Sequence, residues 1–191
     1  MIKAIIFDCF GVLTGDHWKE FVASLPPEQV EEARALNRAY DANILSKNEF
    51  LSAIESLTGN PPSYVESLLD KELSKNSNLL SYITMLKNDY KIGLLSNIAS
   101  DWVTAKFLSE DEQRLFDAMV FSYEIGASKP DTRAYKAICD KLEVDYADCV
   151  FVDDSEGYCI AARELGMQAI LYKDFEQMKA ELDKILNDSK S

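Results

Sequence analysis

The chain alternates between short apolar runs and helical patterns, and this alternation limits its fold more than any other feature. One apolar run opens the sequence at residues 3–8. From about residue 78 helices and apolar runs alternate, and the expected strands there are 91–95, 118–121, 149–152 and 168–171. The accompanying helices are expected to end near 87, to begin near 101, to span 132–142 and 156–165, and to begin at 175. Strands that alternate with helices form a parallel sheet with helices on both faces, so the sequence predicts an α/β fold.

Between the first strand and the alternating part lies a stretch that contains only helical patterns. The four expected helices are 18–25, 28–40, 47–57 and 63–73. Pro26-Pro27 separates the first two, because proline stops one helix and can open the next. Ser46 and Glu49 have the spacing of a capping box at the start of the third. We expect a helical cap of residues 15–77 over the carboxyl ends of the strands, and a core of residues 1–14 and 78–191 whose polar end, 187–191, is frayed.

The charge of the chain limits its partners. The formal net charge is −13, which argues against nucleic acid or an anionic membrane as a main partner. No run approaches the roughly 18 unbroken apolar residues of a membrane-spanning helix. The first strand follows Met1 so closely that no room remains for a signal peptide, and we expect a cytoplasmic protein. The four cysteines form no CxxC pair, so we expect reduced thiols.

Polar residues follow four of the expected strands. Asp8 ends the first, Ser96-Asn97 follows the second, Lys129 comes after the third, and Asp153-Asp154 ends the fourth. The carboxyl ends of the strands in an open parallel sheet border the crevice where ligands bind. Paired carboxylates at this place favour a hard cation such as Mg²⁺. A serine hydroxyl and an asparagine amide can hold a phosphoryl oxygen, and a lysine can neutralise both that group and a nucleophilic carboxylate.

The order Asp8, Ser96, Lys129 and Asp153-Asp154 resembles the four motifs of the haloacid dehalogenase (HAD) superfamily, which lie on successive strand ends of a Rossmann-like core. The resemblance covers nearly the whole chain and includes a helical cap after the first motif. It is closest to small subfamily I sugar-phosphate phosphatases such as α-D-glucose-1-phosphate phosphatase. Residues 128–135 resemble their third motif, 152–155 with 161–166 their fourth, and 43–50 their entry into a cap helix. The resemblance implies a Rossmann-like parallel sheet with an inserted α-helical cap.

The resemblance also implies a role for each matching residue. Asp8 attacks phosphorus and forms an aspartyl-phosphate, a covalent route that divides one difficult step into two. Lys129 stabilises charge on Asp8 and on the phosphoryl group. Ser96, with Asn97 beside it, holds a phosphate oxygen. Gly11 lets the loop turn closely around the phosphate.

A metal site follows from the same resemblance. The carboxylate of Asp8, the main-chain carbonyl of Phe10, and the carboxylates of Asp154 and Asp153 are its implied ligands. The implied cofactor is Mg²⁺, which orients the nucleophile and screens its repulsion from the phosphate. The implied partner is a small-molecule phosphate ester.

Two positions depart from the family pattern. Phosphatases of the family usually carry a second aspartate two residues after the nucleophile, which protonates the leaving group and then activates water. Phe10 stands at that position and can do neither. Tyr158 stands where relatives often have an acidic residue. Asp16 and His17 follow the first motif closely, and they are candidates to replace the missing acid.

Three functions are compatible with these residues. The first is a Mg²⁺-dependent phosphatase for a small phosphorylated metabolite, slow or dependent on an activated leaving group because of Phe10. The second is a 2-haloacid dehalogenase, but Asp153-Asp154 has no purpose in that metal-free chemistry. The third is a catalytically impaired HAD-like protein that binds a phosphorylated ligand or a protein. Substrate choice is expected to depend on cap side chains, among them Arg34, Arg38, Tyr40 and Lys47.

Overall fold

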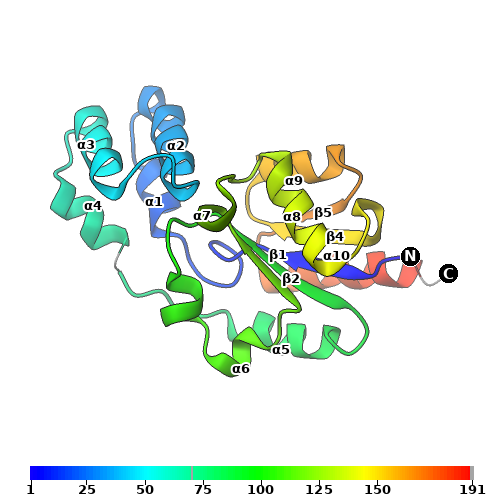
Figure 1. Cartoon of the computed structure of the whole chain (residues 1–191). Helices are drawn as coiled ribbons and strands as arrows, with labels where there is room; N and C mark the ends of the chain where they lie inside the picture. Colours follow the sequence, from blue (N-terminus) through cyan, green and yellow to red (C-terminus); the bar gives the residue numbers. More distant parts are fainter. Residues whose placement is uncertain (70, 190–191) are drawn as a thin grey trace.

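A five-stranded sheet runs through the centre of the computed structural model, which describes residues 1–69 and 71–189. All neighbouring strands are parallel, in the order β3-β2-β1-β4-β5. The strands are β1 (Ala4–Phe7), β2 (Lys91–Ser96), β3 (Ala118–Phe121), β4 (Cys149–Asp153) and β5 (Gln168–Leu171). The predicted α/β fold with a Rossmann-like parallel sheet is therefore confirmed (Figure 1).

Helices cover both faces of this sheet, because its central strands are apolar on both sides. Every residue of β1 is buried. Helices α8 (Thr132–Leu142) and α9 (Glu156–Glu164) contribute to the apolar cluster on one face. Helices α5 (Ser77–Leu86) and α10 (Phe175–Asp188) contribute to the cluster on the other. Figure 1 shows the two pairs on opposite sides of the strands, as expected for a parallel sheet buried on both faces.

Four helices follow β1 and form a block with an apolar cluster of its own. The helices of this four-helix block are α1 (His17–Ala23), α2 (Pro27–Asp41), α3 (Lys47–Thr58) and α4 (Pro62–Leu69). Phe50, Ile54 and Val65 are fully buried among them. The predicted capping box between Ser46 and Glu49 opens α3. Figure 1 shows the block beside the end of the sheet where β1 and β2 terminate, while the N-terminus lies at the opposite end.

The chain enters and leaves this block at one place. Thr14 and Lys75 form an antiparallel bridge. Thr14 Oγ1 also donates to the carbonyl of Ser74 at 2.8 Å. The helix expected at 63–73 ends at Leu69, because the chain beyond it extends back to the core and forms these contacts; residue 70 lies outside the described residues. Tertiary pairing overrides the helical pattern of this segment.

Other parts of the core differ in detail from the expected elements. The helix expected from about residue 101 is a short π-helix, η1 (Val103–Phe107), and a separate turn, α6 (Glu110–Gln113), because Ser109 starts a second capping box with Glu112. Two short elements were not expected, α7 (Ser122–Ile125) and the 3₁₀ turn η2 (Tyr146–Asp148). Of the end expected to be frayed, residues 187 and 188 belong to α10 (Phe175–Asp188), and residues 190–191 lie outside the described residues. Within the described chain, no helix combines the length and apolar character needed to span a membrane.

Candidate active site

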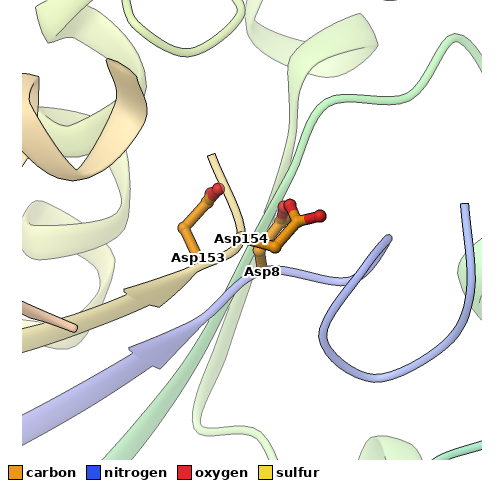
Figure 2. Close-up of side chains that lie close together, drawn as sticks. All are labelled: Asp8, Asp153 and Asp154. Atoms are coloured by element: carbon orange, nitrogen blue, oxygen red, sulfur yellow. The ribbon is translucent and has the colours of Figure 1, made fainter. Parts of the chain in front are cut away.

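Three carboxylates meet at the carboxyl end of the sheet. Asp8 directly follows β1, Asp153 is the last residue of β4, and Asp154 is the next residue. One oxygen of each lies within 4.8 Å of the others (Figure 2). β1 and β4 are neighbours in register, with Phe7 opposite Val152, and this register brings the three side chains together. We call this group the carboxylate cluster.

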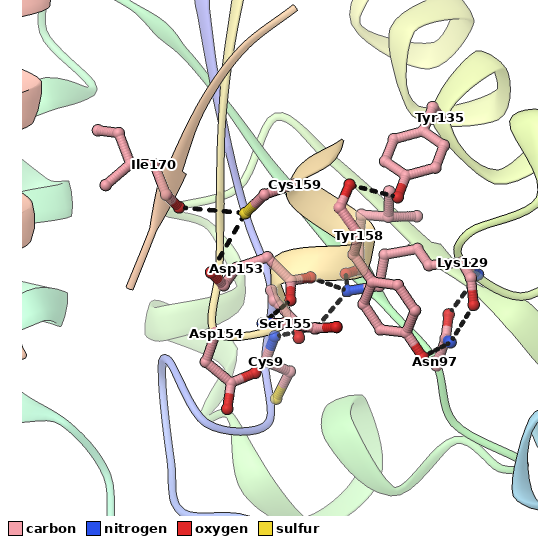
Figure 3. Close-up of polar contacts among 12 residues, drawn as sticks. Cys9, Asn97, Lys129, Tyr135, Asp153, Asp154, Ser155, Tyr158, Cys159 and Ile170 are labelled. Atoms are coloured by element: carbon pink, nitrogen blue, oxygen red, sulfur yellow. Dashed lines mark hydrogen bonds and ion pairs between the residues drawn. The ribbon is translucent and has the colours of Figure 1, made fainter. Parts of the chain in front are cut away.

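Lys129 lies between two members of the cluster. Its Nζ is 2.8 Å from Asp8 Oδ1 and donates to the carbonyl of Leu95 at 3.1 Å. The same Nζ is 2.7 Å from Asp153 Oδ2 (Figure 3). The side chain is fully buried. Burial alone lowers the pKa of Lys129, but the charges of Asp153 and Asp8 outweigh it and hold that pKa above its ordinary value. Lys129 is therefore a permanent cation inside the site.

The Asp8 side chain is held in place from two directions. Its Oδ1 accepts a hydrogen bond of 2.7 Å from the amide of Cys9 and contacts Lys129. Burial and then the charge of Asp153 raise the pKa of Asp8, while Lys129 opposes both. A divalent cation at the cluster favours the ionised carboxylate that nucleophilic attack requires. The Cys9 thiol is buried in the apolar core.

Asp154 has a different environment from its neighbour Asp153. Asp154 is 16% exposed, and its Oδ2 forms an ion pair with Nζ of Lys19 from α1. Lys19 Nζ also donates to the main-chain carbonyl of Asp154 at 3.2 Å. Gly11 lies against the same carboxylate with φ of 81°, and a β-carbon there would overlap it. Only glycine allows the loop after β1 to approach Asp154 so closely.

The donor set fits a hard divalent cation. Three carboxylates and one fully buried ammonium leave an excess of negative charge at the cluster. Mg²⁺ is bound by carboxylate and carbonyl oxygens, usually with several waters retained. The residues that could hold Mg²⁺ are Asp8, Asp153 and Asp154. Their binding of the metal, with help from the main-chain carbonyl of Phe10, stays a prediction.

Ser96 and Asn97, at the end of β2, lie beside the cluster and differ in their hydrogen bonding. The Ser96 hydroxyl is buried and has no hydrogen-bond partner among the residues that the structure describes. An orphaned buried hydroxyl is costly unless a ligand or water satisfies it, and a phosphate oxygen would do so. The Asn97 amide instead donates to the carbonyl of Lys129 at 3.0 Å and accepts from its amide at 2.8 Å. Asn97 thus positions the Lys129 main chain, and its expected contact with phosphate stays a prediction.

The positions near the missing acid do not share one environment. The Phe10 ring stacks on Trp102 at a centroid distance of 5.6 Å. Asp16 caps α1 and accepts from the amide of Lys19 at 2.8 Å; burial raises its pKa, which that hydrogen bond opposes. His17 contacts Glu20 at 3.1 Å and the carbonyl of Glu72, so its ring is engaged with the four-helix block. Of these residues, Asp16 faces the charge of Asp154.

The expected specificity side chains are mostly engaged within the four-helix block. Arg38 and Arg34 pair with Glu31, Lys47 pairs with Glu66, and Tyr40 stacks on Phe50. Arg38 also lines a cleft of about 270 Å³ between α2 and the loop at 126–131. Their contact with a substrate stays a prediction.

The structure brings further polar residues, which the sequence did not single out, to the boundary between the four-helix block and the core. Lys19 and Asp41 come from the block, and Ser122 begins α7. Tyr158, noted only as a departure, places its ring 5.2 Å from the Lys129 ammonium, and burial raises its pKa to about 12. A signal for Lys19 existed, since it follows the first motif closely. No spacing pattern pointed to Asp41.

Two curated proteins resemble the chain over most of its length. Phosphatase MT3486 of Mycobacterium tuberculosis is 30% identical over 198 residues, which cover 89% of this chain and 87% of that protein. D-ribitol-5-phosphate phosphatase of Bacteroides thetaiotaomicron is 25% identical and is matched over its whole length, with 98% of this chain covered. By contrast, the match to bifunctional epoxide hydrolase 2 of Sus scrofa spans only 23% of that protein.

Solved structures share the fold. An enzyme of the same superfamily from Bacteroides thetaiotaomicron, crystallised with magnesium and inorganic phosphate, has a TM-score of 0.66 and 24% identity, covering 91% of this chain and 95% of that one. A 2-haloacid dehalogenase from Pseudomonas syringae has a TM-score of 0.61 and 19% identity, covering 92% and 90%. Because both chemistries occur on this fold, function must be argued from the site. The family model for haloacid dehalogenase-like hydrolases matches residues 2–166, and the chain belongs to this family of hydrolases.

Proposed function

We propose that the protein is a Mg²⁺-dependent phosphatase that hydrolyses a small phosphorylated metabolite through an aspartyl-phosphate on Asp8. The observation that carries this proposal is the contact of 2.8 Å between Asp8 and Lys129 inside a cluster with Asp153 and Asp154. A carboxylate that is fixed beside a buried cation and two further acids is suited to attack phosphorus next to a divalent metal.

Each residue of the site has a part in this chemistry. Asp8 supplies the attacking oxygen, and Lys129 stabilises negative charge on the transferred phosphoryl group. Ser96 holds one phosphoryl oxygen with its otherwise unpartnered hydroxyl. Asp8, Asp153 and Asp154, with the main-chain carbonyl of Phe10, would hold Mg²⁺. The metal, when bound, neutralises the phosphate and orients it toward Asp8.

The division of the chain into two parts belongs to the same proposal. Residues 1–14 and 78–191 form the catalytic core, and residues 15–77 form a cap that selects the substrate. In support, the block has a separate apolar cluster, and the chain enters and leaves it at the bridge between Thr14 and Lys75. The likeness to D-ribitol-5-phosphate phosphatase over 98% of this chain favours a sugar or polyol phosphate as substrate.

A panel of phosphorylated metabolites, assayed for released phosphate with and without Mg²⁺, tests the function. We expect turnover of at least one ester in Mg²⁺ and none after chelation. Asp8→Asn is the matched control, because an amide has the same shape and almost no nucleophilicity. It should reduce turnover to the uncatalysed level while circular dichroism shows an unchanged fold. Near-normal activity of this variant would mean that Asp8 is not the nucleophile.

The same panel separates the alternatives. Phe10 favours a catalytically impaired binding protein, since the usual acid is missing. That reading predicts ligand binding by calorimetry without release of phosphate from p-nitrophenyl phosphate, whose leaving group needs no proton. A dehalogenase would release chloride from 2-chloropropionate without metal. The carboxylate cluster opposes the dehalogenase function, because three acids would repel a carboxylate substrate.

A further inference from the structure

The carboxyl group of Asp41 lies at the boundary between the four-helix block and the core. Asp41 is the last residue of α2 and is only 7% exposed. Its main-chain carbonyl accepts a hydrogen bond of 2.7 Å from Ser122 Oγ, which also accepts one of 2.8 Å from the amide of Ile98. Ile98 comes two residues after Ser96. Asp41 is thereby fixed to the loop that carries the expected phosphate contact.

The Asp41 side chain is satisfied at one oxygen only. Asn37 Nδ2 donates to Oδ2 at 2.7 Å. Over the described part of the chain, Oδ1 has no hydrogen-bond partner. A buried carboxyl group with one free oxygen is able to carry a proton there and to donate it to a ligand.

The charges around Asp41 favour its neutral form. Burial is the largest cause that raises its pKa, and the charge of Asp16 adds to it. The hydrogen bond from Asn37 and the charge of Lys129 oppose the rise, and the resulting pKa is about 8. Burial raises the pKa of Asp16 as well, but the main-chain hydrogen bond that Asp16 accepts from Lys19 opposes this rise. Asp41 is therefore the better proton donor of the two near neutral pH.

We propose that Asp41 donates the proton to the leaving group, in place of the carboxylic acid that is missing at Phe10. This inference rests on the proposed phosphatase function. It gives a catalytic role to the four-helix block, which is then required for the chemistry as well as for substrate choice.

The proton balance has two steps. When the Asp8 carboxylate forms its bond to phosphorus, the bond to the ester oxygen breaks and its electron pair stays on that oxygen. Asp41 gives its proton to this oxygen, so that an alcohol leaves and Asp41 becomes a carboxylate. A water then attacks phosphorus while Asp41 accepts one of its protons. The bond to Asp8 breaks, phosphate is released, and both side chains return to their starting forms.

A leaving-group series tests this role with p-nitrophenyl phosphate, phenyl phosphate and n-propyl phosphate in Mg²⁺. In Asp41→Asn we expect kcat/KM for n-propyl phosphate to fall by about 10²–10⁴-fold, the usual contribution of a general acid. For p-nitrophenyl phosphate, kcat/KM should change less than about threefold, because nitrophenolate leaves unprotonated. With this substrate, kcat of Asp41→Asn should fall, because water is no longer activated and aspartyl-phosphate accumulates. A burst of nitrophenolate should therefore precede steady-state turnover.

The pH dependence gives an independent readout. On n-propyl phosphate, wild-type kcat/KM should decrease above about pH 8, as Asp41 loses its proton. Asp16→Asn is the matched variant: it removes the charge that raises the pKa of Asp41, so this decrease should move to lower pH while activity near pH 6 is retained. The Asp41 carboxyl signal in carbon-13 spectra of the metal-free protein should titrate near pH 8, and at lower pH in Asp16→Asn.

Specific outcomes overturn the inference. Equal losses of kcat/KM for all three esters in Asp41→Asn would assign Asp41 to structure or binding. Loss of n-propyl phosphate turnover in Asp16→Asn at pH 6 would make Asp16 the acid. A wild-type protein that hydrolyses p-nitrophenyl phosphate and leaves n-propyl phosphate at the uncatalysed rate has no acid at all. Absence of turnover with every ester would instead remove the proposed function itself.

Discussion

Two lysines contact the carboxylate cluster from different sides, and they come from different parts of the molecule. Lys129 comes from the core, is fully buried, and contacts Asp8 and Asp153. Lys19 comes from the four-helix block, is 54% exposed, and contacts Asp154. The first cation is enclosed by the sheet and its loops. The second reaches the cluster only because the block lies against the core.

This difference separates a permanent charge from an exchangeable one. A buried ion pair cannot open without leaving a desolvated charge, so Lys129 is a fixed part of the site. An exposed pair contributes little free energy, so Lys19 can be displaced from Asp154 by a competing cation. The cluster is therefore rigid toward the core and open to exchange toward the block.

Removal of the buried partner should have the largest effect on stability. Asp153→Ala leaves Lys129 with one carboxylate and removes the acceptor of the Ser155 amide. We expect a loss of about 3 kcal/mol in the free energy of unfolding, or a decrease of roughly 6–12 °C in Tm. Thermal unfolding followed by circular dichroism measures it. A decrease in Tm no larger than that of Asp154→Ala would contradict the distinction between the buried and the exposed ion pair.

The exposed side should instead control metal affinity. Asp154→Ala should change the free energy of unfolding by less than about 1 kcal/mol, yet weaken Mg²⁺ binding at least about 100-fold. Asp148→Ala is the matched control, because Asp148 is 15% exposed and pairs with Lys3 at the opposite ends of β1 and β4 from the cluster. Calorimetric titration with Mg²⁺ should register the first substitution and not the second.

The smallest expected effect is an increase in affinity. Lys19→Met removes the cation that competes for Asp154, so Mg²⁺ should bind about two- to fivefold more tightly, the equivalent of an exposed ion pair. Lys3→Met changes the net charge equally and breaks a pair of similar exposure, 62% for Lys3 against 54% for Lys19. Unchanged or weaker binding in Lys19→Met would show that the lysine does not oppose the metal.

The sequence predicted the half of the site that the sheet determines. Parallel strands place their carboxyl ends together whatever their connections. Asp8, Ser96, Lys129 and Asp153-Asp154 could therefore be grouped from four apolar runs and the residues that follow them. These inferences needed only the period of a strand and the order of the motifs.

The residues whose positions depend on how the four-helix block packs against the core could not be predicted in this way. Lys19 and Asp41 reach the site only through the angle at which the block meets the core, and no period in the sequence encodes that angle. Asp41 in particular appears as the last residue of a surface helix, and its burial follows from the contact with Ser122. The helix expected to reach residue 73 was wrong for a similar reason, since pairing of Lys75 with Thr14 overrides local preference.

The bridge between Thr14 and Lys75 has a consequence for how such a chain can change over time. The paired residues hold the two ends of segment 15–74 side by side. The distance that this segment must span in the core is therefore short, whatever its length. Insertions, deletions or a wholly different helical arrangement could occupy that gap without moving β1 or the loops that carry the buried charges. Under the proposal that this segment selects the substrate, specificity can change within it while the core stays the same. The proposed role of Asp41 limits this freedom, because any segment that replaces 15–74 must again supply a proton donor for the leaving group.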